Sequence, residues 1–312
     1  MISKIPHIGL PLSIVLVLFA CNQVNTGNTK FKGGVGDMQY IIHEDHEGDI
    51  IKEGDFASIF AIEKTENDSV IYSSYEMDNR PALLSRDVAY FKGDFNTALG
   101  MLSEGDSATF KINRDSLVET GREDLKNISG KYVVFTIKID KVIHRGLLSD
   151  SLYNIQIENF RKAERDKAKL AEPEKLKRYL SSLRSTPKVT ESGLNYIIHK
   201  QGEGEPAVQG DTIIINYTAK YLSGKIFDTN YPEVAKKAGV YKPSKQYTPL
   251  LLTVEGKAES GFDQGLLLFP KGTHATLIIP SRLAYGEEGG RGVKPWTPVI
   301  CEMEIVDIKR KR

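Results

Sequence analysis

A five-residue stretch, Asn195-Tyr196-Ile197-Ile198-His199, occurs almost unchanged earlier in the chain as Gln39-Tyr40-Ile41-Ile42-His43. The motif Glu53-Gly54-Asp55 also recurs, as Gln209-Gly210-Asp211, at the same offset of 156 residues. A chance match would not keep its register over that distance. Two further pairs match at an offset of 167 residues: Gly93-Asp94-Phe95 with Ser260-Gly261-Phe262, and residues 104–109 with residues 271–276. The sequence therefore predicts an internal duplication with a longer loop in the second copy.

Each copy closes on an alternating apolar run, at residues 133–139 and 299–305, which is typical of a half-buried antiparallel strand. Other β-branched runs, such as residues 212–217 and 275–279, are separated by Gly, Pro and Asp turns. Residues 261–269 favour a single short helix. The predicted fold class is α+β, with two domains that are each an antiparallel sheet wrapped on one short helix.

The segment between the copies predicts a helical connector, residues 147–187. Its apolar side chains Leu176, Tyr179, Leu180 and Leu183 follow the spacing of one helix face, and Pro173 stands at a plausible first helical position. The mixed charges of residues 161–167 are typical of a solvated face. The apolar stripe could pack on a domain or on another protomer, so a homo-oligomer through the connector is possible.

The N-terminus has the pattern of a signal sequence. Lys4 precedes an apolar run, residues 8–20, that is short for a membrane span and suits a signal peptide. The run ends Leu18-Phe19-Ala20-Cys21, which resembles the lipobox of bacterial lipoproteins. We therefore expect a signal peptide at 1–20, a lipid on Cys21, a flexible tether at 21–36 and attachment to a membrane of the cell envelope. An uncleaved anchor, or an ordinary secretory signal with a chance cysteine, is the alternative.

Composition argues against several other classes of function. The 312 residues include 42 basic and 41 acidic side chains, which leaves no net field to attract nucleic acid. The two cysteines, Cys21 and Cys301, form no pair with the spacing of a zinc site or a disulfide framework. The cluster from His43 to His46 lacks an evident third and fourth metal ligand. We expect neither a metal nor a cofactor.

The second copy carries an ordered set of motifs. They are Gly210-Asp211 followed by Tyr217, then Gly224-Lys225-Ile226-Phe227-Asp228, Gly261-Phe262-Asp263-Gln264-Gly265 and Leu283-Ala284-Tyr285-Gly286. Together they resemble an FKBP-type peptidyl-prolyl cis/trans isomerase domain, over Val189 to Lys309. The resemblance implies an aromatic cup that forms the active pocket, made of Tyr217, Phe227, Asp228, Phe262 and Tyr285.

The same resemblance implies a substrate-binding wall. Its expected members are Leu250 or Leu252, the main-chain N–H near Glu259, and Cys301. Trp296, in the loop after Tyr285, is expected either to shield the pocket or to cover an edge of the core. Phe262 stands where the family usually has Trp, and Cys301 stands where an aromatic residue is usual. An insertion at residues 229–249, with a helical turn capped by Gly239, could line the groove.

The first copy has lost the polar side chains of the cup. At matched offsets, Tyr217 becomes Ala61, Asp228 becomes Ser73 and Tyr285 becomes Val118. The scaffold positions remain apolar as Tyr72, Phe95 and Phe135. We expect a degenerate FKBP-like domain at 37–146, a spacer or a binding surface for unfolded chains, before an isomerase domain at 188–312.

The resulting functional hypothesis is isomerisation of Xaa-Pro bonds in envelope proteins, as a folding helper. The expected partners are proline-containing clients, the membrane through Cys21 and macrolide inhibitors of the FKBP family, without nucleic acid. The alternative is a non-catalytic protein that grips proline segments in the same cup.

Overall fold

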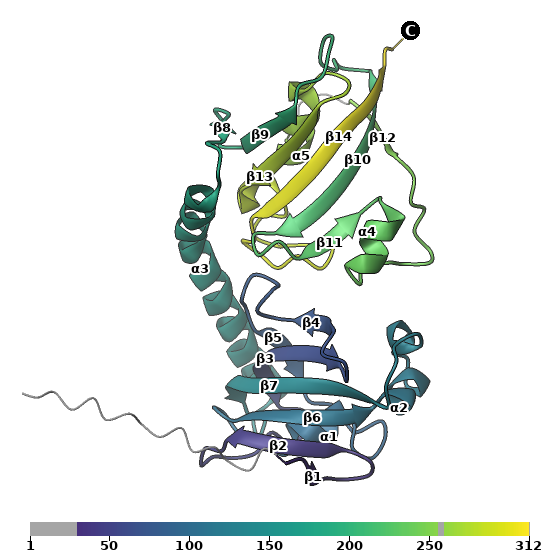
Figure 1. Cartoon of the computed structure of the whole chain (residues 1–312). Coiled ribbons are helices and arrows are strands. Elements are labelled where there is room, and N and C mark those ends of the chain that lie inside the picture. The colour runs from purple at the N-terminus through teal and green to yellow at the C-terminus, as the bar shows by residue number, and fades with distance from the viewer. Residues whose placement is uncertain (1–29, 255–258, 312) are drawn as a thin grey trace, which may run out of the picture. The chain divides into compact units, whose positions relative to one another are not determined.

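The computed structural model describes residues 30–254 and 259–311. Cys21 and the expected signal peptide lie outside these residues. The described chain forms two seven-stranded antiparallel sheets, which confirms the expected α+β class (Figure 1). None of the described helices combines the length and the hydropathy needed to cross a bilayer.

The first sheet has the strand order β1-β2-β6-β7-β3-β4, with β5 also paired to β3. Its strands are β1 (Lys32–Gly33), β2 (Gln39–Glu44), β3 (Phe56–Thr65), β4 (Val70–Ser73), β5 (Ala82–Ser85), β6 (Ser107–Asn113) and β7 (Tyr132–Ile143). The helices of this domain are α1 (Phe95–Leu99), α2 (Arg114–Glu119) and the 3₁₀ turn η1 (Glu123–Leu125). Ala98 and Leu99 of α1 join the core, so this short helix fills the inner face of the sheet.

The second sheet repeats the plan in the order β11-β10-β14-β13-β9-β8, with β12 also paired to β10. Its strands are β8 (Lys188–Val189), β9 (Asn195–Lys200), β10 (Thr212–Tyr221), β11 (Ile226–Thr229), β12 (Leu250–Thr253), β13 (His274–Ile279) and β14 (Val299–Lys309). The helices are α4 (Pro232–Lys237), α5 (Gly261–Leu268) and the 3₁₀ turn η2 (Ser281–Leu283). Helix α5 lies against one face of the sheet (Figure 1), and its Leu266 is buried in the core.

The ladders show that the duplication extends to the irregularities of the sheets. The β3–β7 pairing shifts between Ser58 and Ile59, and the β10–β14 pairing shifts at the equivalent step, Ile214 to Ile215. Each sheet also has a bulge in its β2 or β9 strand, at His43 and at His199. Because a bulge is a placed feature and not a random defect, matched bulges indicate one ancestral domain.

The bulge gives His43, the first residue of the His43–His46 cluster, a structural role that is repeated at His199. His43 Nε2 contacts the Thr109 hydroxyl at 2.8 Å, and His199 Nε2 makes the equivalent 2.7 Å contact with Thr276. Glu44 is paired with Lys138. Across the described residues, no three His, Cys, Asp or Glu side chains are grouped to hold a metal ion.

The repeated Gly-Asp motif ties the two longest strands of each sheet together. Asp55 accepts hydrogen bonds from the Lys52 and Arg145 amides at 2.8 Å each. Asp211 accepts from the Val208 and Lys311 amides at 2.9 Å each. Each carboxylate therefore links the start of one central strand to the end of its neighbour, which is a structural role in both copies.

The connector is helical, but it starts earlier than the sequence suggested. Helix α3 (Asp150–Ser182) contains Pro173, so the expectation that Pro173 opens the helix is wrong. Ser149 is the N-cap, and Tyr153 and Ile157 are buried in a cluster with Phe56. This packing fixes the start of the helix well before Pro173.

Candidate active site

The five residues expected to form the cup come together in the second domain. Tyr217 lies on β10, Phe227 and Asp228 lie on β11, Phe262 lies in the first turn of α5, and Tyr285 follows η2. The ring centroids of Tyr217 and Phe262 are 6.4 Å apart, and those of Phe227 and Tyr285 are also 6.4 Å apart, with both pairs close to edge-on. These rings are half-buried, so each keeps part of its surface accessible to solvent.

A phenol and a carboxylate form the polar pair of the cup. The Tyr217 hydroxyl donates to Asp228 Oδ2 at 2.8 Å, and the Thr229 amide donates to Asp228 Oδ1 at 2.9 Å. Burial, followed by the bond to Asp228, raises the pKa of Tyr217 well above its usual range. The phenol is therefore neutral at physiological pH, and its proton is committed to Asp228.

Tyr285 differs from Tyr217 in that its hydroxyl is not engaged. Among the described residues, no side-chain hydrogen bond reaches this hydroxyl, although burial raises its pKa above the usual value. It is a neutral donor that remains available to a bound molecule. Its ring lies against Phe227, so the donor stands over an apolar surface.

The structure adds Lys245, which sequence reasoning missed. Its Nζ forms an ion pair with Asp228 Oδ1, donates to the Thr229 carbonyl oxygen at 2.8 Å, and lies 3.3 Å from the Tyr217 hydroxyl. The ammonium also lies 5.5 Å from the Tyr217 ring centroid. The insertion after β11 thus supplies the counter-ion of the cup, a role that no local motif around Lys245 indicates.

Asn230 is a second residue that sequence reasoning missed. Its Oδ1 accepts from the Tyr217 amide at 2.8 Å, and its Nδ2 donates to the carbonyl oxygens of Ile215 and Thr248 at 3.2 and 3.0 Å. The side chain is only 5% exposed. It therefore anchors the insertion to β10 directly behind Tyr217, and the one signal in the sequence is a polar residue next to the strand.

The expected wall residues occupy different environments. Leu252 packs against the core, whereas Leu250, on the same face of β12, is 37% exposed. Cys301 is 4% exposed within the core of the domain, and burial raises its pKa to about 12. Glu259 is exposed next to Ser260, the N-cap of α5. Trp296 is half-buried in the loop before β14, and its amide donates to the Gly286 carbonyl oxygen at 2.9 Å.

The insertion contains the expected helical turn. Helix α4 ends at Lys237, and Gly239 follows it with φ of 70°, in the left-handed region that glycine adopts most easily. The remaining segment carries Tyr241 and Tyr247, whose rings stack at 4.9 Å. Lys245 Nζ lies 5.6 Å from the Tyr247 ring centroid, so this ring helps to hold the cation at the cup.

The strand pairings shift the alignment of β4 with β11, which the sequence offset had set, by one residue. Tyr72 pairs with Glu63 across β3 and β4, as Asp228 pairs with Ala219 across β10 and β11. Ser74 Oγ accepts from the Ala61 amide at 2.9 Å, which reproduces the Asn230 bond to Tyr217. The counterpart of Asp228 is therefore Tyr72, and the sequence-based match to Ser73 is wrong. The match of Tyr217 to Ala61 agrees with both ladders.

Comparison with known proteins gives a match over the part of the chain that carries these residues. Residues 203–306 match the model of the FKBP-type peptidyl-prolyl cis-trans isomerase family. Over these residues the second domain is similar to the FKBP-type isomerases. The cup of the second domain falls within the matched residues, whereas the first domain lies outside them.

Named relatives match about two fifths of the chain. FKBP-type peptidyl-prolyl cis-trans isomerase FkpA of Escherichia coli K12 is 30% identical over 122 residues, which are 39% of this chain and 40% of the relative. The FKBP-type 22 kDa isomerase of the same strain is 32% identical over 120 residues, 38% of this chain and 52% of the relative. The chain thus spans about half or less of the length of these relatives. A crystal structure of FkpA from Escherichia coli gives a TM-score of 0.40 at 23% identity, covering 64% of this chain and 84% of that one.

Proposed function

We propose that this chain is a peptidyl-prolyl cis/trans isomerase that assists protein folding, with the FKBP-type domain as its catalytic part. The observation that carries the proposal is the Tyr217–Asp228 hydrogen bond at 2.8 Å, set among the rings of Phe227, Phe262 and Tyr285. The match of residues 203–306 to the isomerase family supports it.

The reaction needs a pocket and no covalent chemistry. Rotation about an Xaa-Pro bond is opposed by amide resonance, with a barrier of about 18–20 kcal/mol. In the twisted transition state the resonance is lost and the carbonyl group becomes less polar. A dry aromatic cup stabilises this state more than the planar ground state, which is the differential binding that catalysis requires.

The polar groups of the cup position the substrate. The free Tyr285 hydroxyl is suited to donate to a substrate carbonyl oxygen, and the main-chain N–H near Glu259 is a second candidate donor. Asp228 and Lys245 hold the Tyr217 ring at the side of the cup. Each tenfold gain in rate needs only about 1.4 kcal/mol of preference for the twisted state, which aromatic packing and one or two hydrogen bonds can provide.

An isomerisation assay on short Xaa-Pro peptides tests the proposal. The full chain should accelerate exchange, and Asp228→Ala and Tyr285→Phe should each reduce kcat/KM. Arg291→Lys, on the loop after Tyr285, keeps its charge and is a matched control. If the full chain gives no acceleration with any residue before proline, the protein is not an isomerase.

The proposed cellular place rests on the N-terminal sequence. We propose that Cys21 carries a lipid and holds the protein on a bacterial envelope membrane, where proline-containing clients fold. Mass spectrometry of the mature N-terminus tests this directly, since lipidation would make Cys21 the first residue with an added acyl mass. A mature protein that starts elsewhere would exclude the anchor. Binding of macrolide inhibitors and oligomerisation through α3 are further proposals, which calorimetry and light scattering would test.

A further inference from the structure

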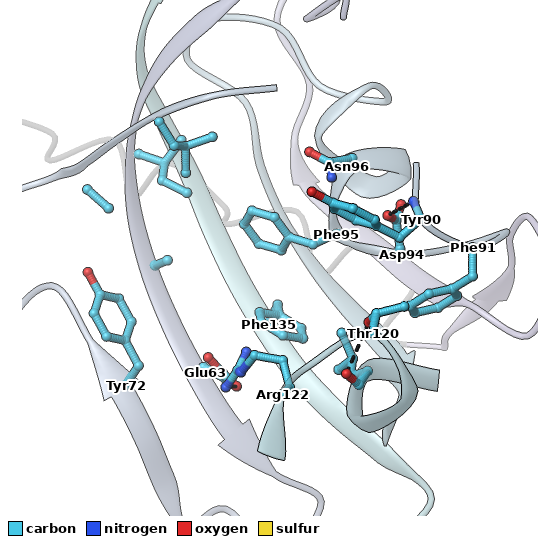
Figure 2. A pocket seen from close by; sticks show the side chains of 15 residues that line it. Glu63, Tyr72, Tyr90, Phe91, Asp94, Phe95, Asn96, Thr120, Arg122 and Phe135 are labelled. Carbon is cyan, nitrogen blue, oxygen red and sulfur yellow. Dashed lines mark hydrogen bonds and ion pairs between the residues drawn. The ribbon is translucent and has the colours of Figure 1, made fainter. Parts of the chain in front are cut away.

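The first domain contains a cavity of about 480 Å³ at the place where the second domain has its cup. Figure 2 shows its aromatic side chains, with Phe95 and Phe135 at the centre and Tyr72 on the far strand. The ring centroids of Phe95 and Phe135 lie 5.3 Å apart. These two residues occupy the positions that Phe262 and Cys301 have in the second domain. A cavity of this size is in the range of small-ligand and side-chain sites.

The cavity is open because the tyrosine of this cup stands on a different strand from the tyrosine of the second cup. Ala61 stands on β3 where Tyr217 stands on β10, which leaves the space of a phenol empty. The phenol of this cup comes instead from Tyr72 on β4, the counterpart of Asp228. The apolar floor is thus kept, while the Tyr–Asp pair of the isomerase cup is absent.

A different set of charges lies at the edge of the cavity. Glu63 is 7% exposed and accepts from Arg122 Nη2 at 2.6 Å through Oε1, and the same guanidinium binds Asp124 at 2.8 Å. Two carboxylates share one cation, so this edge carries a net negative charge. Burial raises the pKa of Glu63 in spite of Arg122, which indicates that the carboxylate is incompletely compensated.

Two polar atoms of this edge have no partner in the described structure. Glu63 Oε2 and the Tyr72 hydroxyl take part in no hydrogen bond there, and Glu63 and Tyr72 are directly paired across the two strands. No fully buried side-chain N or O atom of the described residues lacks a partner, so both atoms are reached by solvent. Both residues line the cavity, which places an acceptor and a phenol at its side.

We infer that this cavity is a second polypeptide-binding site, which takes a large apolar side chain adjacent to a Lys or Arg. The apolar side chain enters the cavity and packs against the rings of Phe95 and Phe135, and the neighbouring cation reaches Glu63 Oε2. A desolvated carboxylate beside aromatic faces favours a cation over an anion. Since the catalytic pair is missing, the site holds a segment without isomerising it, and it does so independently of the isomerase cup.

Two proline-free fluorescent peptides, identical except for Phe-Lys or Phe-Glu at the centre, test the inference by anisotropy with the full chain. We expect the Phe-Lys peptide to bind about tenfold more tightly than the Phe-Glu peptide, because one charge-assisted hydrogen bond is gained and one repulsion is avoided. Equal affinities, or no binding of the Phe-Lys peptide, would overturn the inference.

Two variants localise the binding. Glu63→Gln keeps the size of the side chain and should abolish the preference for Phe-Lys, whereas Glu47→Gln, at an exposed position of the same domain, should keep it. Ala61→Leu fills the space left by the missing phenol and should weaken the binding of both peptides. Thermal unfolding verifies that each variant is folded. If a folded Ala61→Leu chain binds both peptides as the parent does, the site lies elsewhere.

Discussion

The two domains share a scaffold and differ in the side chains that face one small volume. Both have the same strand order and bulges at the same ladder steps. In the second domain the cup holds Tyr217 on the central strand and Asp228 on its neighbour. In the first domain the same two positions are Ala61 and Tyr72.

This difference teaches where fold and chemistry are encoded. Backbone pairing, bulges and the Asp55 and Asp211 links fix the sheet, and they tolerate replacement of every polar residue of the cup. The chemistry depends on a few side chains whose spacing along a strand is set by that sheet. A duplicated domain can therefore lose one activity and keep a cavity suited to another ligand.

The largest expected effect comes from giving the second cup the residues of the first. The double variant Tyr217→Ala, Asp228→Tyr removes the hydrogen-bonded pair and should lower kcat/KM for Xaa-Pro peptides at least about 100-fold, or about 2.7 kcal/mol. The isomerisation assay measures it, with thermal unfolding as the check on the fold. Retained activity would show that the aromatic rings suffice without the pair.

The reverse exchange sharpens the comparison. Ala61→Tyr with Tyr72→Asp rebuilds the pair in the first domain, but Val118 still lacks the hydroxyl that Tyr285 supplies. In a chain whose second cup is inactivated by the exchange above, we expect no isomerisation to return. A measurable gain in that background would mean that the pair alone creates the activity.

The next effect concerns the carboxylate that both domains share. Asp55→Asn keeps the shape but removes the charge that accepts two amide hydrogen bonds, and it should destabilise the protein by about 2 kcal/mol at pH 7. Burial alone would raise the pKa of Asp55, yet the bonds from Lys52, Arg145 and His144 outweigh it and lower the pKa. Urea unfolding of the full chain gives the difference.

The pH dependence of this effect has a definite sign. Because the folded pKa of Asp55 is lowered, its stabilisation is complete above the unfolded value of about 3.9 and is lost as the pH falls through the folded value. The gap in stability between the parent and Asp55→Asn should therefore narrow below about pH 4. Asp45→Asn, at an exposed position, should have the same stability as the parent both at pH 7 and below about pH 4. A gap that widens in acid would contradict the assigned role.

A smaller effect is expected at Lys245, which has no counterpart in the first domain. Lys245→Met keeps an aliphatic stem but removes the ion pair with Asp228, and it should lower kcat/KM about fivefold through looser positioning of Tyr217. Lys242→Met, in the same insertion and exposed, is the matched control. Equal losses in the two variants would assign the effect to the insertion as a whole.

Much of this architecture could be predicted from the sequence because it is periodic or repeated. The alternating strands, the short helix at Gly261 and the ordered motifs of the cup are local patterns, and the structure brings the five cup residues together. The start of α3 was missed because burial of Tyr153 and Ile157 decides it, which no helix signal near Pro173 reveals.

The errors at the cup have a different cause. Asp228 was matched to Ser73 by the offset along the sequence, and only the ladders show that Tyr72 stands opposite Glu63 as Asp228 stands opposite Ala219. Lys245 reaches Asp228 across a loop that the first copy lacks, so neither repetition nor periodicity points to it. Contacts of this kind depend on tertiary geometry, which no local pattern in the sequence reveals.

The smallest effect is expected at Cys301, which stands where the first domain has Phe135. Its thiol is 4% exposed, and burial raises its pKa to about 12, so almost no thiolate exists at pH 8. In a Cys21→Ser chain, Ellman's reagent should detect no thiol in the native protein and one in urea. Rapid reaction in the native state would mean that Cys301 lines the cup and meets substrate, as the family resemblance suggested. Slow reaction would mean that the thiol belongs to the core of the domain and does not meet substrate, in keeping with its low exposure.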